Sequence, residues 1–194
     1  SLIAPQLAHS WSGNLVTNAT WRDFWLNEGT TTYLTYRIMD AVYNTRRGNM
    51  ERVLGQQDLV EAFEQATHEG DKALAFDQRG RDPDEVFSSI PYQRGQLFLS
   101  YLEAKFGRKK FDAFLCGWFD DNAFQSRTSE DFLAYLDEKL PKPNPGIVSR
   151  AKVDAWVYDA AMPADAVYAQ SDVFGKVEEQ RAAWLSGKVP AAKL

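Results

Sequence analysis

The chain has 194 residues, of which 44% are hydrophobic and 25% are charged, and its formal net charge is −5. This length is enough for one domain with a sizeable core, or for one domain and a small appendage. The acidic balance argues against nucleic acid as a partner, because phosphate binding needs clustered Lys and Arg. No apolar run approaches the roughly 20 residues that cross a bilayer.

The first residues read SLIA rather than starting with an initiator methionine, so we expect the chain to be an internal part of a longer protein. Cys116 is the single cysteine, which excludes an internal disulfide. We expect its side chain to be a small buried group on a helix.

Apolar spacing is helical almost throughout the chain, and strand-like alternation is nearly absent. Pro5 is compatible with the start of a helix but not with its interior, so we expect regular helix from about Pro5, with residues 1–4 outside it. A turn at Gly13-Asn14 then leads to Thr20-Trp21-Arg22-Asp23, which resembles a capping box. This pattern predicts a long helix over residues 25–43.

The middle of the chain reads as two helices separated by a loop. Gly48 is interpreted as the end of a turn, and the apolar residues after it predict a helix with a loose pattern: Met50, Val53, Leu54, Leu59, Val60 and Phe63. Residues 68–84 are polar and contain Gly and Pro, which predicts a long loop of the kind that is more often functional than idle. A helix restarts after Pro91, with Gly107 as its C-cap.

The clearest helical pattern follows, with apolar residues at i, i+3, i+4, i+7 and i+8: Phe111, Phe114, Leu115, Trp118 and Phe119. Thr128 or Ser129 can cap the next helix, which Pro141 stops. The sequence PKPNPG at 141–146 is the best candidate for a boundary. Beyond it we expect a short helix capped by Ser149 and a last helix near 171–186, which makes the fold mainly α.

Two residues near the N-terminus suggest metal chemistry. A catalytic zinc takes three protein ligands, and a helix supplies two of them at i and i+4 because these positions share a face. His9 ends the first helix and Glu28 lies in the next, so the two side chains could face each other. Alone this is a weak signal, because a single histidine near an apolar face is usually structural.

The residues around His9 and Glu28 strengthen this signal for a zinc site. LAHSWSGNLVTN followed by WLNEGTTTYL resembles the gluzincin zinc aminopeptidases, the family that includes aminopeptidase N and leukotriene A4 hydrolase, whose signature is H-E-x-x-H, eighteen residues and the Glu of N-E-G. The resemblance continues in DPDEVFSSIPYQRG at 82–95 and VDAWVYDAAMP at 153–163, and it is strongest to the leukotriene A4 hydrolase-like branch. It covers essentially the whole chain.

The resemblance implies roles for individual residues. His9 would be the second zinc ligand, Glu28 the third, and Tyr92 the phenol that stabilises the developing oxyanion. Pro5 stands in the place of the first ligand and Gln6 in the place of the general base, and neither can do the chemistry of the residue it replaces.

Two further residues of the polar loop are candidates. His68 lies at the start of this segment and does not replace the missing ligand by motif; we expect it to be solvated. Asp84 precedes Tyr92 in the chain and could add a negative charge to a substrate pocket, although simple solvation of a loop acid is an equal alternative.

The resemblance also implies an architecture. Residues 1–163 would be the helical lobe of a thermolysin-like metallopeptidase catalytic domain, and residues 164–194 the linker and first helix of a C-terminal helical domain. The expected activity is removal of N-terminal residues from peptides by zinc-activated water, with this chain inactive because of Pro5 and Gln6. The alternative is a helical fragment or pseudoenzyme without metal. We expect no nucleic-acid or membrane partner, a cytoplasmic location, and self-association through uncovered helix faces.

Overall fold

The computed structural model describes residues 2–190 and 192. Its elements, with 3₁₀ helices labelled η, are α1 (Ile3–Ala8), β1 (Val16–Asn18), η1 (Trp21–Asp23), α2 (Trp25–Val42), α3 (Thr45–Gln65), η2 (Glu69–Lys72), η3 (Pro83–Val86), α4 (Ile90–Phe106), α5 (Arg108–Asp121), β2 (Gln125–Arg127), α6 (Ser129–Lys139), α7 (Arg150–Tyr158) and α8 (Asp172–Leu185). Within the described residues the strands form one two-stranded parallel sheet, with Val16 opposite Gln125. The expectation of a mainly α fold is confirmed.

Most helices form where the apolar spacing predicts them. All five apolar residues of the clearest pattern are buried in α5. Gly107 ends α4 with a φ of 82°, in the region that favours glycine. The side chain of Thr128 forms a capping box with Asp131 at the start of α6, and Ser149 accepts the backbone N–H of Lys152 at the start of α7. Local capping signals therefore located these helix ends correctly.

Four local predictions were wrong. Gly48 lies inside α3 rather than at the end of a turn, because α3 starts earlier and packs closely there beside Asp40. Thr20 does not cap a helix; its hydroxyl donates to the Asp23 carboxylate at 2.6 Å. Cys116 is exposed, since it lies outside the buried stripe of α5. The turn at 141–146 joins two helices of the same core.

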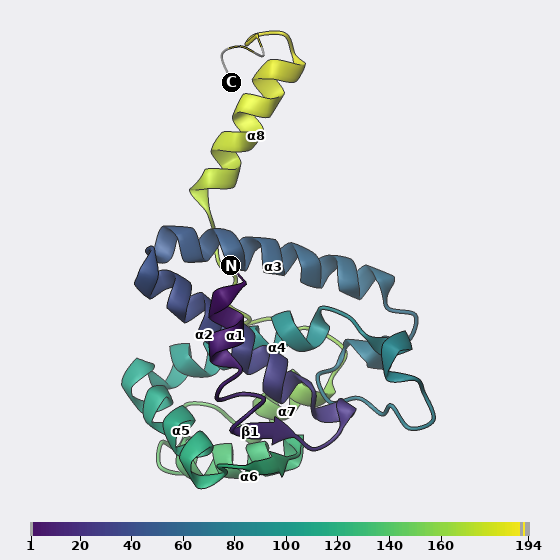
Figure 1. Ribbon diagram of the computed structural model, residues 1–194, viewed down its shortest axis with the longest axis vertical. Coiled ribbons are helices and arrows are strands. Elements are labelled where there is room, and N and C mark those ends of the chain that lie inside the picture. The colour runs from purple at the N-terminus through teal and green to yellow at the C-terminus, as the bar shows by residue number, and fades with distance from the viewer. Residues whose placement is uncertain (1, 191, 193–194) are drawn as a thin grey trace.

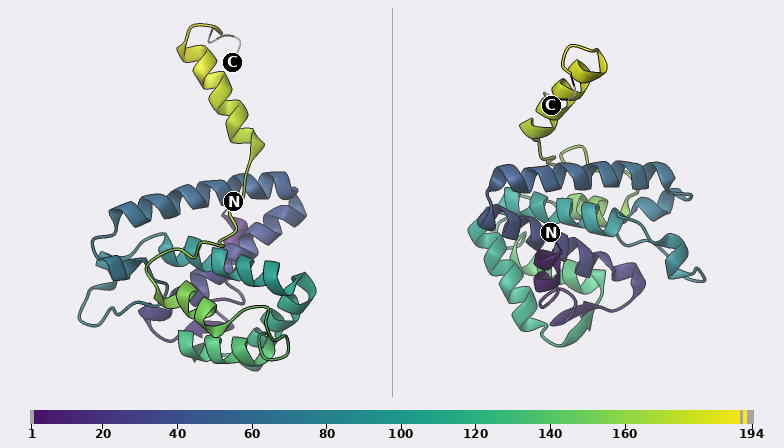
Figure 2. Two further views of the ribbon diagram at one scale, coloured as in Figure 1. Left: turned by 180° about the vertical axis from the view of Figure 1, so that it is seen from behind. Right: turned by 45° about the horizontal axis from the view of Figure 1, so that its top comes forward.

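The helices form a bundle from which one helix projects. α3 lies across the bundle on the side from which α8 extends, whereas α5 and α6 lie at the opposite end (Figure 1). α8 stands clear of the other helices in both further views and has no buried residue (Figure 2). The linker before it is fastened to α3, because the Gln56 amide exchanges hydrogen bonds of 3.0 and 2.7 Å with the backbone of Ala169. None of the described helices has the length and apolar character needed to cross a membrane.

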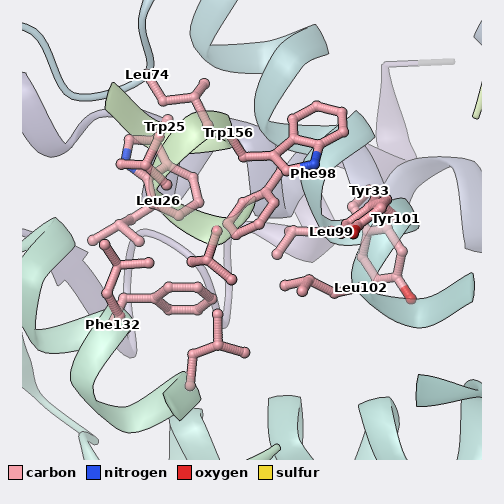
Figure 3. Packing of buried hydrophobic residues seen from close by; sticks show 14 of the residues in the cluster. Trp25, Leu26, Tyr33, Leu74, Phe98, Leu99, Tyr101, Leu102, Phe132 and Trp156 are labelled. Atoms are coloured by element: carbon pink, nitrogen blue, oxygen red, sulfur yellow. The ribbon is translucent and has the colours of Figure 1, made fainter. Parts of the chain in front are cut away.

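Aromatic side chains from distant segments meet in the core (Figure 3). The Trp25 ring of α2 lies 5.8 Å from Phe98 of α4 and 5.4 Å from Phe132 of α6, measured between centroids. Trp156 of α7 stacks on the other side, 5.8 Å from Phe98. Because each of these rings is at most 1% exposed, the core joins α2, α4, α6 and α7 into one unit.

The contact between α2 and α4 is unusually close, because a glycine on each helix faces the other. A methyl group added to Gly95 would lie 2.8 Å from the Cα of Gly29, and one added to Gly29 would lie 3.0 Å from the carbonyl oxygen of Pro91. Backbone atoms cannot move aside as a flexible side chain can. Both positions therefore require glycine for this packing rather than for turn geometry.

Arg94 of α4 is fully buried without a carboxylate partner. Its guanidinium instead donates to six backbone carbonyl groups, those of Lys72, Ala155, Trp156, Asp159, Ala160 and Ala161. Five of these distances lie between 2.6 and 3.1 Å. Burial lowers the pKa of Arg94 to about 10. This side chain ties α4 to the C-terminal end of α7, where carbonyl groups lack helical partners.

A second buried polar group holds the start of α2. Asp23 is 1% exposed and accepts hydrogen bonds from the N–H and hydroxyl of Ser129, at 2.7 and 2.8 Å. The Ser129 hydroxyl in turn accepts from the indole N–H of Trp25 at 2.9 Å. The chain entering α2 is thus joined to the first turn of α6.

Gly95→Ala is expected to destabilise the protein by about 1–3 kcal/mol, because the methyl group forces α2 and α4 apart. Urea unfolding followed by circular dichroism measures the change. Gly175→Ala is the matched control, since Gly175 is also helical but has no neighbour within 4 Å, and its unfolding midpoint should stay unchanged. Equal midpoints for the two variants would contradict the close helix contact.

Tyr36→Phe is expected to reduce the loss of stability at alkaline pH. Burial raises the pKa of Tyr36 to about 12, so its contribution is complete below about pH 10 and is lost as pH rises through 12. For a shift of two units this is at most roughly 3 kcal/mol. Urea midpoints at several values from pH 9 to 12 give the slope, and Tyr43→Phe, on an exposed residue, is the control. Parallel slopes for the two variants would show that Tyr36 does not titrate with unfolding.

Candidate functional site

The site begins at α1. Pro5 lies in the first turn, where its missing N–H needs no partner within the helix. The helix nevertheless begins at Ile3, so the prediction that residues 1–4 lie outside it is wrong for Ile3 and Ala4. Ala4 and Ala8 are buried on α1, and this packing favours helix on both sides of the proline. The Gln6 side chain is exposed.

His9 follows α1 and meets Glu28 of α2. His9 Nε2 lies 3.7 Å from Glu28 Oε2, so the expected packing of the two segments is confirmed. The other ring nitrogen, Nδ1, lies 2.9 Å from the carbonyl oxygen of Ser12. A carbonyl oxygen can only accept, so Nδ1 carries the proton of the neutral ring and Nε2 presents its lone pair towards Glu28. Burial raises the pKa of Glu28, and the nearby His9 opposes that rise.

Tyr92 lies in the first turn of α4, the helix that packs against α2 and its Glu28. Its ring packs edge-on against Phe24 and Phe87, with centroids at 5.9 and 6.1 Å. Burial raises the pKa of Tyr92 to about 12, and the negative charge of Glu28 adds to the rise. The phenol is therefore protonated at neutral pH and can donate a hydrogen bond beside the carboxylate. Its role in catalysis stays a prediction.

An apolar cavity of about 250 Å³ opens beside Phe24 and Phe87. Its walls include Trp21, Phe24, Pro83, Asp84, Phe87 and Pro91. Two of these aromatic residues are the ones that pack against Tyr92. The cavity can accept an apolar group of a ligand.

The two candidate residues of the polar loop lie in different places. Asp84 sits in η3 at the wall of this cavity, with its backbone N–H bonded to Asp82 at 3.0 Å. The structure therefore puts an acidic residue at this wall, to which the polar residues Gln78 and Ser88 also contribute. His68 is exposed at the start of η2, as expected for a solvated loop residue.

The residues around His9 and Glu28 do not supply the third protein ligand that a catalytic zinc site needs. Pro5 offers no side-chain lone pair, and its carbonyl already accepts the N–H of His9 at 3.0 Å. Across residues 2–190 and 192, no group of three His, Cys, Asp or Glu side chains is placed to hold a metal ion. The residues present do not fit the complete zinc centre that the resemblance implies.

Sequence reasoning missed two kinds of residue at this site. Ser12 and Thr31 contact the His9 ring from a turn and from α2, yet neither belongs to a ligand pattern. Trp21 and Phe24 line the cavity, and neither was predicted as a site residue. Their spacing from Glu28 along the chain, seven and four residues, was the only signal, and it does not separate a cavity wall from a core.

Similarity to known proteins agrees with this geometry. The sequence matches the peptidase family M1 domain over residues 1–156. It is 40% identical over 169 residues to leucine aminopeptidase 2 of Aspergillus niger, covering 84% of this chain and 27% of that protein. Leucine aminopeptidase 2 of Ajellomyces capsulatus is 38% identical over 198 residues, covering 98% of this chain and 32% of the relative. The chain thus spans about a third or less of these proteins.

Solved structures give the same grouping. Native leukotriene A4 hydrolase from Saccharomyces cerevisiae superposes with a TM-score of 0.83 at 33% identity, over 93% of this chain and 29% of the yeast chain. An M1 zinc metallopeptidase from Deinococcus radiodurans shares the fold at 23% identity, with a TM-score of 0.68 over 86% of this chain and 34% of its own. Because the M1 domain covers most of its length, the chain belongs to peptidase family M1.

Proposed function

We propose that this chain is the helical part of a zinc-dependent aminopeptidase and that it is inactive as it stands. The observation that carries the proposal is the meeting of His9 and Glu28, 3.7 Å apart, beside a protonated Tyr92. In an active relative these would be two zinc ligands and the donor to the oxyanion. With Pro5 and Gln6 in the remaining places, the chain lacks a ligand and a base.

The substrate class follows from the cavity and the relatives. The two fungal relatives are named leucine aminopeptidases. An apolar space of about 250 Å³ beside Phe24 and Phe87 is suited to an aliphatic or aromatic side chain. We therefore assign peptides with an apolar N-terminal residue to the active parent protein, with Asp84 at the wall as a carboxylate that faces the substrate.

The rest of the parent protein would complete the site. Residues 1–163 then belong to the catalytic domain, and residues 164–194 begin a C-terminal helical domain. The absence of buried residues in α8 supports this division, because a helix of that domain would be covered by its own neighbours. Exposed apolar side chains on α1 and at the end of α2, including Leu2, Ile3 and Tyr43, support self-association of the isolated chain. A cytoplasmic location completes the proposal.

A non-catalytic role is the second candidate, and the replacement of two adjacent residues favours it. Pro5 and Gln6 remove ligand and base together while the His9–Glu28 contact persists. The chain would then keep the fold of the family without its metal, and serve by contact with other chains.

Zinc binding after dialysis at neutral pH tests whether Pro5 and Gln6 account for the proposed loss of the zinc site. The unaltered chain is expected to retain well under one equivalent, because two protein ligands hold zinc weakly. Pro5→His with Gln6→Glu should approach one equivalent, since residues 5 and 9 are one helical turn apart. Binding should also raise the thermal midpoint of this variant when zinc is in excess. Metal analysis and thermal unfolding give both quantities.

Gln6→Glu alone is the matched control, because it adds the acid without the missing ligand. Full zinc occupancy in the unaltered chain would refute the proposed loss of the zinc site. Equal occupancy in the control and the double variant would show that position 5 does not face the metal.

A further inference from the structure

We propose that Thr31 is a positioning residue, whose hydroxyl together with the Ser12 carbonyl holds the His9 ring so that Nε2 faces Glu28. This inference deepens the proposed function, on which it rests for the identity of the site. The orientation of the ring is a property of the metal-free chain and can be measured without zinc.

The contacts form a closed set of hydrogen bonds. His9 Nδ1 lies 2.9 Å from the Ser12 carbonyl oxygen and 3.2 Å from the Thr31 hydroxyl oxygen. The Thr31 hydroxyl donates to the same carbonyl at 3.3 Å, and it lies 2.6 Å from the Ser12 hydroxyl. Ser12 and Thr31 are 1% and 2% exposed, so water does not compete for these groups.

Two arrangements of protons satisfy these groups, and Nδ1–H donates to the Ser12 carbonyl in both. The Thr31 hydroxyl either donates to that carbonyl while it accepts from the Ser12 hydroxyl, or donates to the Ser12 hydroxyl, which then donates to the Ala8 carbonyl at 3.4 Å. If Nδ1 were instead unprotonated, its lone pair would face the carbonyl oxygen at 2.9 Å. Two acceptors at that distance repel, so the arrangement selects the Nδ1–H tautomer.

The position of Thr31 in the chain links this set to Glu28. Residues i and i+3 share a face of a helix, so α2 carries both the carboxylate and the hydroxyl that contact His9. The turn also fits closely around Nδ1, because a methyl group at Gly13 would lie 3.1 Å from that atom. The ring is therefore held from the turn and from α2 at once.

The first measurement is the tautomer of His9 by long-range ¹H–¹⁵N NMR at about pH 9, where an ordinary imidazole is neutral. The unaltered chain should show protonated Nδ1 at His9. Thr31→Val keeps the shape but removes the hydroxyl that bonds Ser12, so the Ser12 carbonyl is held less firmly against Nδ1 and the share of the Nε2–H form should rise. His68, the other of the two histidines and an exposed one, is an internal reference for a free ring.

Two variants separate positioning from packing. Thr31→Ser keeps the hydroxyl and should restore the Nδ1–H form. Thr30→Val makes the same change at a neighbour that is 4% exposed and is not a partner of the His9 ring, so it should leave the tautomer unchanged. If Thr31→Val does not fold, Thr31→Ala supplies the same test with a smaller side chain.

The second measurement is zinc affinity in the Pro5→His, Gln6→Glu background. Adding Thr31→Val should weaken binding by about 10- to 100-fold, as for other residues that orient metal-binding histidines. Adding Thr30→Val should not. Equal tautomers and equal affinities for the Thr31→Val and Thr30→Val variants would overturn the proposal. A tautomer shift in a background that binds no zinc would support Thr31 while refuting the proposed function.

Discussion

The close contact between α2 and α4 sets the geometry on which the rest of the molecule depends. Gly29 and Gly95 face each other without side chains between them, so the two helix backbones touch. Glu28 precedes one glycine, and Tyr92 lies one turn before the other. The carboxylate and the phenol are therefore placed by helix backbones rather than by loops, which are more mobile. A larger residue at either glycine would separate these two groups as it separates the helices.

Buried polar groups restrict the small rotations of the helices that this contact would still allow. Apolar packing is non-directional and would tolerate small rotations of the helices. Asp23 joins the start of α2 to Ser129, and Arg94 joins α4 to the end of α7. Hydrogen bonds to buried charged groups have strict geometry and are costly to break, so they define one arrangement among those that the core would allow.

The proposed loss of the chemistry and the retention of the fold are separable in this chain. The residues of α1 that pack inward are Ala4 and Ala8, whereas the Gln6 side chain is exposed. Pro5 sits in the first turn, where a missing N–H costs little. Replacing a ligand and a base at these two positions therefore leaves the contacts of His9, Glu28 and Tyr92 intact. This explains how the chain remains similar to its relatives while its donors fall short of a metal site.

Sequence by itself determined the helical fold and most helix ends, because spacing and capping are local properties that neighbouring residues decide. His9, Glu28 and Tyr92 were predicted as site residues through the family resemblance. The start of α1, the burial of Arg94 and the place of Gly48 came only from tertiary packing. So did the hydrogen bonds that Ser12 and Thr31 make with His9, since they join a turn to a helix nineteen residues further on. In the sequence, a hydroxyl on a helix face cannot be told apart from an ordinary polar surface residue. Only the tertiary structure shows which partner packs against it.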